Sequence, residues 1–263
     1  MPSIPVDILH HILEHVDKAT LLKICLVNKV CCSCSQDILY RDIQFDGECF
    51  SVTQICRTLS ESTHLAKRVR SFEMINCDYV FQLRNEQTLR KSLQNMTCLR
   101  SLHFDDPNYN ILDGCTFKLD SFFSNYIYPD KTLCRFLCSQ PSLTDVRIGM
   151  KIKGYSYVPE LGPCLPNLTR VTTRFSWLPH IIPNRPVNQV ISHGSRWFDE
   201  SADLSFFTLS TAPIQKLAIH YTYLHSSPLQ LLASIFPSLT HLTLNPASWD
   251  RGMVSEPFLF IYQ

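Results

Sequence analysis

The residues with the clearest chemical potential are two histidines and a glutamate near the N-terminus. The stretch His11-Ile12-Leu13-Glu14-His15 matches the H-x-x-E-H signature of one class of zinc peptidases. His11 and His15 are one helical turn apart and could chelate zinc, with Glu14 as the general base. The same stretch carries apolar residues at helical spacing, however, and both histidines fall on the polar face opposite them. A zinc peptidase is therefore kept as an alternative, because short motifs often match by chance.

A second candidate for metal binding is Cys31-Cys32-Ser33-Cys34. Structural zinc usually takes paired ligands presented by two turns, whereas these cysteines fall in a predicted helix without a clear second pair. The chain has 12 cysteines, mostly inside apolar runs, and we interpret them as reduced, buried thiols. With only 7 glycines, phosphate-cradling loops are not expected. The sequence thus predicts no catalytic residue, no metal and no cofactor.

The composition is that of a folded chain without a strong overall charge. Of its 263 residues 45% are hydrophobic and 18% charged, and the net charge of +1 gives no general attraction to nucleic acid or anionic membrane. No window approaches the roughly 18 apolar residues of a membrane helix. The first 16 residues lack the features of a secretory signal. We therefore expect a cytoplasmic or nuclear protein that binds neither nucleic acid nor membrane.

The elements that carry these motifs are three short predicted helices. The first begins at Pro5, the second spans 21–27 with Thr20 as N-cap, and the third spans 29–39. The second is apolar on nearly every side, so more than one side must be covered. Three helices in about forty residues hold too little core to be stable alone. Their surplus apolar surface predicts a partner. The stripe of the first helix consists of Ile8, Leu9, Ile12, Leu13 and Val16.

The run of residues 4–43 resembles the F-box in the order and spacing of its motifs. It has the Ile-Pro start, an Ile-Leu helix, a Leu-Leu helix leading into Val27-Asn28-Lys29, and the closing Leu39-Tyr40-Arg41. The resemblance implies a three-helix module that binds a Skp-family adaptor and, through it, a cullin-RING ubiquitin ligase. Many F-boxes have a large anchor after Val-x-Lys, where this chain has Val30, Cys31 and Cys32, a departure that bears on docking strength. The residues implied to carry the contact or the packing beneath it are Ile4, Pro5, Ile8, Leu9, Ile12, Leu13, Leu21, Leu22, Leu26 and Val27.

A pattern of the form apolar-x-x-apolar-x-apolar recurs along the rest of the chain. Several intervals between copies are 25 or 30 residues, as from Leu143 to Leu168 and from Val69 to Leu99. Such intervals are typical of leucine-rich repeats, each a short strand and a returning helix. The wider interval after Leu99 predicts an insertion at 105–130. The copies lie at 69–74, 99–104, 143–148, 168–171, 214–219 and 239–244, with a degenerate one near 187–190.

The arrangement resembles the degenerate leucine-rich repeats that follow an F-box in large fungal families. The predicted fold class is therefore α/β, with a three-helix F-box at 1–46 followed by an irregular leucine-rich-repeat solenoid at 47–263. The alternative is an ordinary α/β domain whose strands happen to begin with leucine. The resemblance predicts a substrate-recognition adaptor subunit of an SCF-type cullin-RING ubiquitin ligase, which is not an enzyme. An F-box-like scaffold acting outside a ligase is the other interpretation.

In a solenoid, alternate strand positions would face outward along one shared surface. That geometry predicts a mildly basic strip, which could hold an acidic or phosphorylated segment of a protein substrate. Ordinary solvated surface residues are the alternative. Trp177, Trp197 and Trp249 could anchor a partner, although packing is the more common role. The strip residues proposed to bind substrate are His103, Arg147, Arg170, Arg174, Lys216, His220 and His241.

Overall fold

The computed structural model describes residues 4–46, 49–75, 79–105, 109–125, 131–149, 161–193, 203–221, 232–246 and 258–261. The chain divides into two compact units, which we describe separately. The first unit contains 1–104 and 110–119, and the second contains 105–109 and 120–263. The domain boundary predicted after residue 46 falls inside the first unit, and the independence of that segment stays a prediction.

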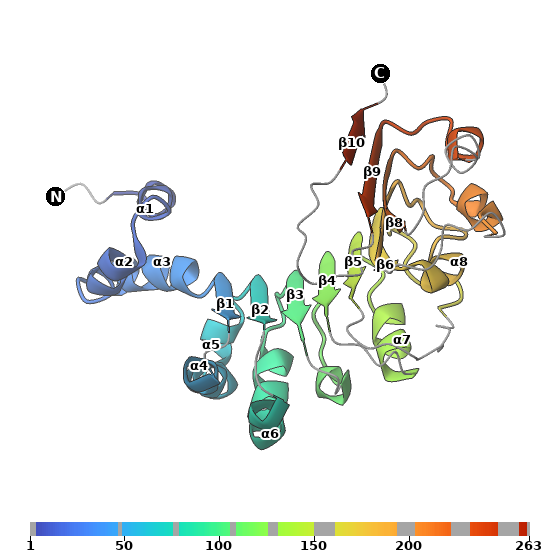
Figure 1. Cartoon of the computed structure of the whole chain (residues 1–263). Coiled ribbons are helices and arrows are strands. Elements are labelled where there is room, and N and C mark those ends of the chain that lie inside the picture. Colours follow the sequence, from blue (N-terminus) through green and yellow to red (C-terminus); the bar gives the residue numbers. More distant parts are fainter. Residues whose placement is uncertain are drawn as a thin grey trace. The chain divides into compact units, whose positions relative to one another are not determined.

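Three helices, drawn in dark blue in Figure 1, open the first unit: α1 (Val6–Leu13), α2 (Lys18–Ile24) and α3 (Lys29–Leu39). Their common core is small. Leu13, Leu21 and Cys34 are its buried members, one from each helix. The partly buried side chains packed against these three are Leu9, Val16, Ile24, Ile38 and Leu39.

Side-chain caps fix where the second and third helices begin. The Asp17 carboxylate accepts hydrogen bonds from the Thr20 N–H at 3.0 Å and the Thr20 hydroxyl at 2.7 Å. The Asn28 side-chain oxygen accepts from the Cys31 N–H at 2.8 Å. Each bond from a backbone N–H satisfies a donor that a helix N-terminus leaves open. The prediction of Thr20 as the cap was wrong, because the longer reach of the Asp17 carboxylate starts α2 three residues earlier. The helix then ends at Ile24 rather than at Val27.

The rest of the first unit is a parallel sheet with helices along one side (Figure 1). Strand β1 (Asp42–Asp46) pairs with β2 (Ser71–Ile75), and β2 pairs with β3 (Ser101–Phe104). In β2 and β3 buried residues alternate with half-buried ones, so one face of each strand points into the core. The helices on that side are α4 (Cys49–Glu61), α5 (Thr63–Ala66) and α6 (Tyr79–Asn95), of which α4 packs against α6.

The second unit contains parallel strands joined by segments of several kinds. Strands β4 to β8 each pair in parallel with the next strand along the chain, and β10 pairs antiparallel with β9. The strands are β4 (Ser121–Ser124), β5 (Asp145–Ile148), β6 (Arg170–Arg174), β7 (Gln189–His193), β8 (Lys216–Tyr221), β9 (His241–Pro246) and β10 (Phe258–Ile261). The connecting helices are α7 (Lys131–Cys138), α8 (Leu178–Ile181) and the 3₁₀ turns η2 (Phe175–Trp177) and η3 (Ser205–Leu209). A further 3₁₀ turn, η1 (Tyr109–Leu112), follows β3.

One backbone contact sets the register where most strands begin. The residue before a strand offers its carbonyl oxygen to two successive N–H groups at the start of the next strand. Thus the Arg41 oxygen accepts from Arg70 and Ser71 at 2.8 and 3.0 Å, and the Thr144 oxygen accepts from Thr169 and Arg170 at 3.0 and 2.9 Å. Because such contacts use donors that would otherwise be open, they fix the register from strand to strand.

The predicted fold class, a three-helix F-box followed by a leucine-rich-repeat solenoid, was wrong. The predicted α/β class fits in part, but the described residues form a structure in which the nine strands β1–β9 each pair in parallel with a neighbour. Helices α1–α3 share a compact unit with β1–β3. The segments between strands also differ from one another, whereas a solenoid repeats one return segment. Strands do lie in the predicted copies, and the expected insertion at 105–130 contains β4.

Two cysteines depart from the expectation of reduced thiols throughout. Cys138, the last residue of α7, forms a disulfide with Cys164, and the two Cα atoms are 4.8 Å apart. The residues are 26 positions apart in sequence, so only the fold brings them together. Nearby, the buried Arg185 guanidinium donates to the carbonyl oxygens of Gly162 and Cys164 at 2.6 and 2.7 Å. Arg185 is thus bonded to the same segment, residues 162–164, that the disulfide attaches to α7.

Candidate docking surface on the N-terminal helices

Exposed apolar side chains are concentrated at the N-terminal end of the first unit. In the described part of the chain nine large apolar residues are exposed, and eight of them lie between residues 4 and 30. Leu209, in η3, is the ninth. Such a concentration is typical of interaction sites. We call these eight residues, whose exposed fractions range from 50% to 87%, the N-terminal apolar surface: Ile4, Val6, Ile8, Ile12, Leu22, Leu26, Val27 and Val30.

The structure divides the ten residues predicted for adaptor contact into two groups. Leu13 and Leu21 are buried, and Leu9 packs against them. These three hold the helices together rather than face a partner. The other seven are exposed: Ile4, Pro5, Ile8, Ile12, Leu22, Leu26 and Val27.

Sequence reasoning missed two members of the surface, Val6 and Val30. Val6 was left out because the stripe was counted from Ile8 onward. Val30 was considered only as a small residue in the place of a larger anchor, yet its side chain is 50% exposed at the start of α3. The sequence also did not predict that Leu21 is buried while its neighbour Leu22 is exposed. In a helix that is apolar on every side, the pattern of residues does not indicate which side faces the core.

The H-x-x-E-H motif spans the C-terminal end of α1 and the two residues after it, where Glu14 takes part in ion pairs. The Arg41 guanidinium donates to the Glu14 carboxylate at 3.0 Å, and this bond lowers the pKa of Glu14. His10 and His11 lie 3.7 and 3.6 Å from the same carboxylate, and the rings of His11 and His15 meet edge to face. A carboxylate with a lowered pKa and a bound arginine is a weak general base. The geometry gives no support to the zinc-peptidase alternative.

The cysteine-rich stretch lies on α3 and faces the small core. Cys34 is buried, Cys31 and Cys32 are half-buried, and burial raises the pKa of the Cys34 thiol. Burial also raises the pKa of Cys25, with Cys32 as a further cause. The raised pKa values of Cys25 and Cys34 favour the protonated thiol, whereas a metal ligand must lose its proton. Across the described ranges, no three His, Cys, Asp or Glu side chains form a group that could hold a metal ion.

Part of the predicted basic strip forms a charged network on the second unit. The Asp145 carboxylate forms ion pairs with the guanidinium groups of Arg147, on its own strand, and Arg170, on the adjacent strand. The nitrogen-to-oxygen distances are 2.9 and 3.0 Å. Arg170 also donates through Nε to the Gln189 side chain at 3.1 Å. The hydrogen bond to Asp145 raises the pKa of Arg147. Two cations thus share one carboxylate, so this part of the strip carries less free positive charge than its arginines suggest.

The other strip residues are not all on one surface. Lys216 and His241 are exposed and occupy paired positions of β8 and β9. Arg174 is half-buried, and burial lowers its pKa. His103 belongs to the first unit, where its Nδ1 lies 2.6 Å from the Glu73 carboxylate on the neighbouring strand. The His220 side chain lies outside the described residues, as do Trp197 and Trp249, whereas Trp177 is buried in packing.

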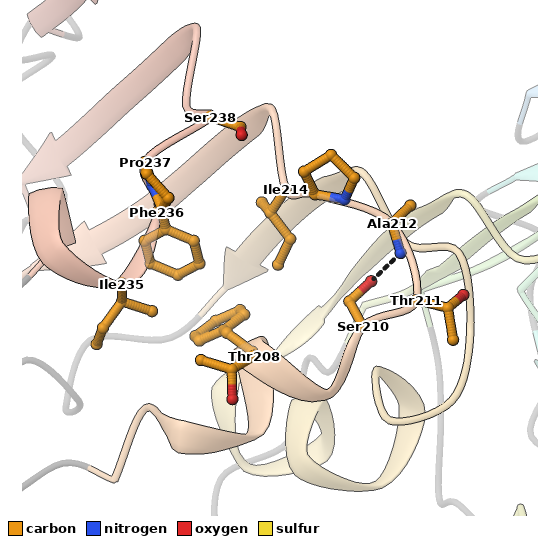
Figure 2. A pocket seen from close by; sticks show the side chains of 11 residues that line it. Thr208, Ser210, Thr211, Ala212, Ile214, Ile235, Phe236, Pro237 and Ser238 are labelled. Carbon is orange, nitrogen blue, oxygen red and sulfur yellow. Dashed lines mark hydrogen bonds between the residues drawn. The ribbon is translucent and has the colours of Figure 1, made fainter.

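A pocket in the second unit lies between η3 with its following turn and residues 235–238 (Figure 2). Its floor includes the rings of Phe207 and Phe236, whose centroids are 4.9 Å apart. The Ser210 hydroxyl contacts the carbonyl oxygens of Arg185 and Val187 and the Ala212 N–H, the last shown in Figure 2. Every lining residue is apolar or carries a hydroxyl, so the walls offer no acid or base to a substrate. The lining residues are Phe207, Thr208, Ser210, Thr211, Ala212, Pro213, Ile214, Ile235, Phe236, Pro237 and Ser238.

In the described part of the chain, none of the helices combines the length and the hydropathy required to cross a bilayer. Neither a protein-family model nor a curated protein matches the chain.

Proposed function

We propose that the chain is a substrate-recognition adaptor whose N-terminal apolar surface docks on a Skp-family protein. Through that protein it would join a cullin-RING ubiquitin ligase, and other subunits would transfer ubiquitin. The observation that carries the proposal is that, of the nine large apolar residues exposed in the described part of the chain, eight lie between positions 4 and 30. Fully burying a leucine or isoleucine contributes about 1.5–3 kcal/mol, so covering such a surface is a strong drive toward association.

The resemblance of residues 4–43 to the F-box pattern suggests the occupant. The F-box pattern assigns ten residues to adaptor contact or its packing, and seven of these ten are exposed in the structure. Leu22 and Leu26 are among the seven, with exposed fractions of 61% and 87%. A surface meant for the chain's own core would not expose side chains at these positions. An adaptor of this type works inside the cell, and we place the protein in the cytoplasm or nucleus. There the Cys138–Cys164 pair would meet reducing conditions.

The second unit is the proposed site of substrate capture. Arg147 and Arg170 are 46% and 44% exposed in their side chains and are already oriented by Asp145. Guanidinium groups held in a fixed direction are suited to carboxylate or phosphate oxygens. Lys216 and His241 extend the same face on β8 and β9. We propose that this face binds an acidic or phosphorylated segment of a protein substrate.

Docking is tested with a pair of matched leucines. Leu26→Asp places a charge in the proposed interface, whereas Leu209→Asp places the same charge at a side chain that is 55% exposed on the second unit. Both proteins should fold, because neither leucine is buried. Co-purification of a Skp-family adaptor should be lost with Leu26→Asp and retained with Leu209→Asp. Equal recovery of the adaptor with both variants would remove the basis of the proposal.

Substrate capture is tested separately with Arg147→Glu. Reversing this charge leaves the N-terminal apolar surface unchanged, so adaptor binding should be retained. Substrates captured from cells should be lost, and capture by the wild type should weaken with added salt because surface charges are screened. If captured substrates bind Arg147→Glu as tightly as the wild type, the arginines are ordinary surface residues.

A further inference from the structure

A second pocket, in the first unit, is lined entirely by titratable side chains. It lies where α1, the end of α3 and α5 approach the segment that leads into β2. The short basic stretch Lys67-Arg68-Val69-Arg70 supplies three of the cations, and sequence reasoning gave it no role. Every lining side chain can carry a charge at some pH: His10, Asp37, Arg41, His64, Lys67, Arg68 and Arg70.

The pocket concentrates positive charge on a chain that has almost none overall. Its lining carries three arginines and one lysine against Asp37, and Glu14 pairs with Arg41 from outside the lining. Four cations against two carboxylates leave an excess of two positive charges with both histidines neutral. The whole chain has a net charge of only +1. Like charges placed this close repel each other, so a bound anion would relieve the repulsion.

Two of the arginines are also held in place by backbone carbonyl oxygens, which add no negative charge to the pocket. Arg68 donates to the Ser33 carbonyl oxygen at 2.8 Å and pairs with Asp37. Arg70 donates to the Cys98 carbonyl oxygen at 3.0 Å, a neutral acceptor. Cations fixed before binding lose little side-chain freedom when a ligand arrives.

Two groups of the pocket have donors still available. Lys67 is exposed and has no carboxylate within ion-pair distance in the described ranges. The Arg68 Nε–H is buried and has no acceptor among the described residues. A buried N–H donor is normally hydrogen-bonded in a folded protein, so this position favours a ligand that carries an oxygen acceptor.

We propose that this pocket is an oxyanion site that takes a single phosphate group. A phosphate carries up to two charges at neutral pH, which matches the excess of two cations, and its oxygens suit arginine forks. A nucleic-acid strand fits less well, because its bases need aromatic platforms and no aromatic residue apart from the histidines lines the pocket. The phosphate could be free or carried on a phosphorylated side chain. The inference does not depend on adaptor docking, since the lining excludes every residue of the N-terminal apolar surface.

The test is calorimetric titration of the full chain with inorganic phosphate and with a peptide carrying one phosphoserine. Lys67→Glu is compared with Lys91→Glu, which makes the same charge change at an exposed lysine of α6 in the same unit. Losing one cation and adding a carboxylate in the pocket should weaken phosphate binding about tenfold or more, whereas the α6 change should alter it less than about twofold. Thermal unfolding of both variants checks that they are folded, and Lys67→Gln replaces Lys67→Glu if the latter is not.

The outcomes separate the sources of the phosphate and can overturn the site. Tighter binding of the phosphopeptide than of its unphosphorylated form and of free phosphate identifies a phosphorylated side chain. Equal binding of the phosphopeptide and free phosphate identifies the free anion, and both results support the pocket. The site is refuted if wild-type protein takes up no phosphate, or if the Lys67 and Lys91 variants lose affinity to the same extent.

Discussion

The adjacent residues Leu21 and Leu22 of α2 offer the sharpest test of how the N-terminal helices are arranged. Leu21 is 1% exposed and belongs to the small core with Leu13 and Cys34, whereas Leu22 is 61% exposed. Replacing each by alanine removes the same atoms from neighbouring positions of one helix. Helix propensity changes equally in both, so any difference reports burial alone.

The structure predicts opposite effects of the two substitutions. Leu21→Ala removes side-chain atoms from a core of three buried residues and should lower the free energy of unfolding by about 2–5 kcal/mol. Leu22→Ala removes atoms that are mostly in water and should change that free energy by at most roughly 0.5 kcal/mol. At an interface, however, truncating a contact residue that a partner covers should weaken adaptor binding by about 1–2 kcal/mol.

The assay combines urea denaturation of the full chain, followed by circular dichroism, with adaptor binding by calorimetry. Leu21→Ala should shift the denaturation midpoint of the transition that includes α1–α3, and Leu22→Ala should leave it in place. If both variants shift the midpoint equally, α2 does not face the way the structure has it. If Leu22→Ala binds the adaptor as tightly as wild type, the exposed side of α2 is not the docking surface.

Three further predictions follow from single contacts. Arg185→Met leaves at least three carbonyl oxygens without their hydrogen-bond donor, including those of Gly162 and Cys164. The substitution should lower the free energy of unfolding, measured by urea titration, by about 3 kcal/mol. An unchanged denaturation midpoint would contradict this prediction. Arg41 lowers the pKa of Glu14 from its ordinary value of 4.5. The ionised Glu14 therefore stabilises the folded state above pH 4.5, and this stabilisation is lost as the pH falls through the lower pKa of the folded protein. Glu14→Gln should therefore be less stable than wild type at neutral pH and equal to it in acid, as measured by the urea midpoint at each pH. His11→Ala combined with His15→Ala should leave both the thermal midpoint and the zinc content by elemental analysis unchanged, and one zinc per chain lost in that variant would revive the peptidase alternative.

Local pattern was enough to place most elements but not to arrange them. The first and third N-terminal helices and the strands near Leu102, Val146 and Leu217 lie where apolar spacing predicts them, because each spacing reflects one buried face. The second helix begins and ends three residues before its predicted bounds. Strand β1 was missed because residues up to 43 were assigned to the F-box pattern, and β4 because Ser124 stands where the recurring pattern has its last apolar residue. The solenoid was wrong because the copies of a strand pattern do not reveal the segments that join them.

The sequence by itself determined that residues 4–30 carry more apolar side chains than three short helices can bury. Only the tertiary structure decided which of them face water, because Leu21 and Leu22 have the same side chain and differ only in direction. It also decided which charges meet. Asp145 pairs with Arg170 from 25 positions away, and Arg68 with Asp37 from 31. Contacts at such separations depend on strand order and helix packing, and no local spacing in the chain encodes them.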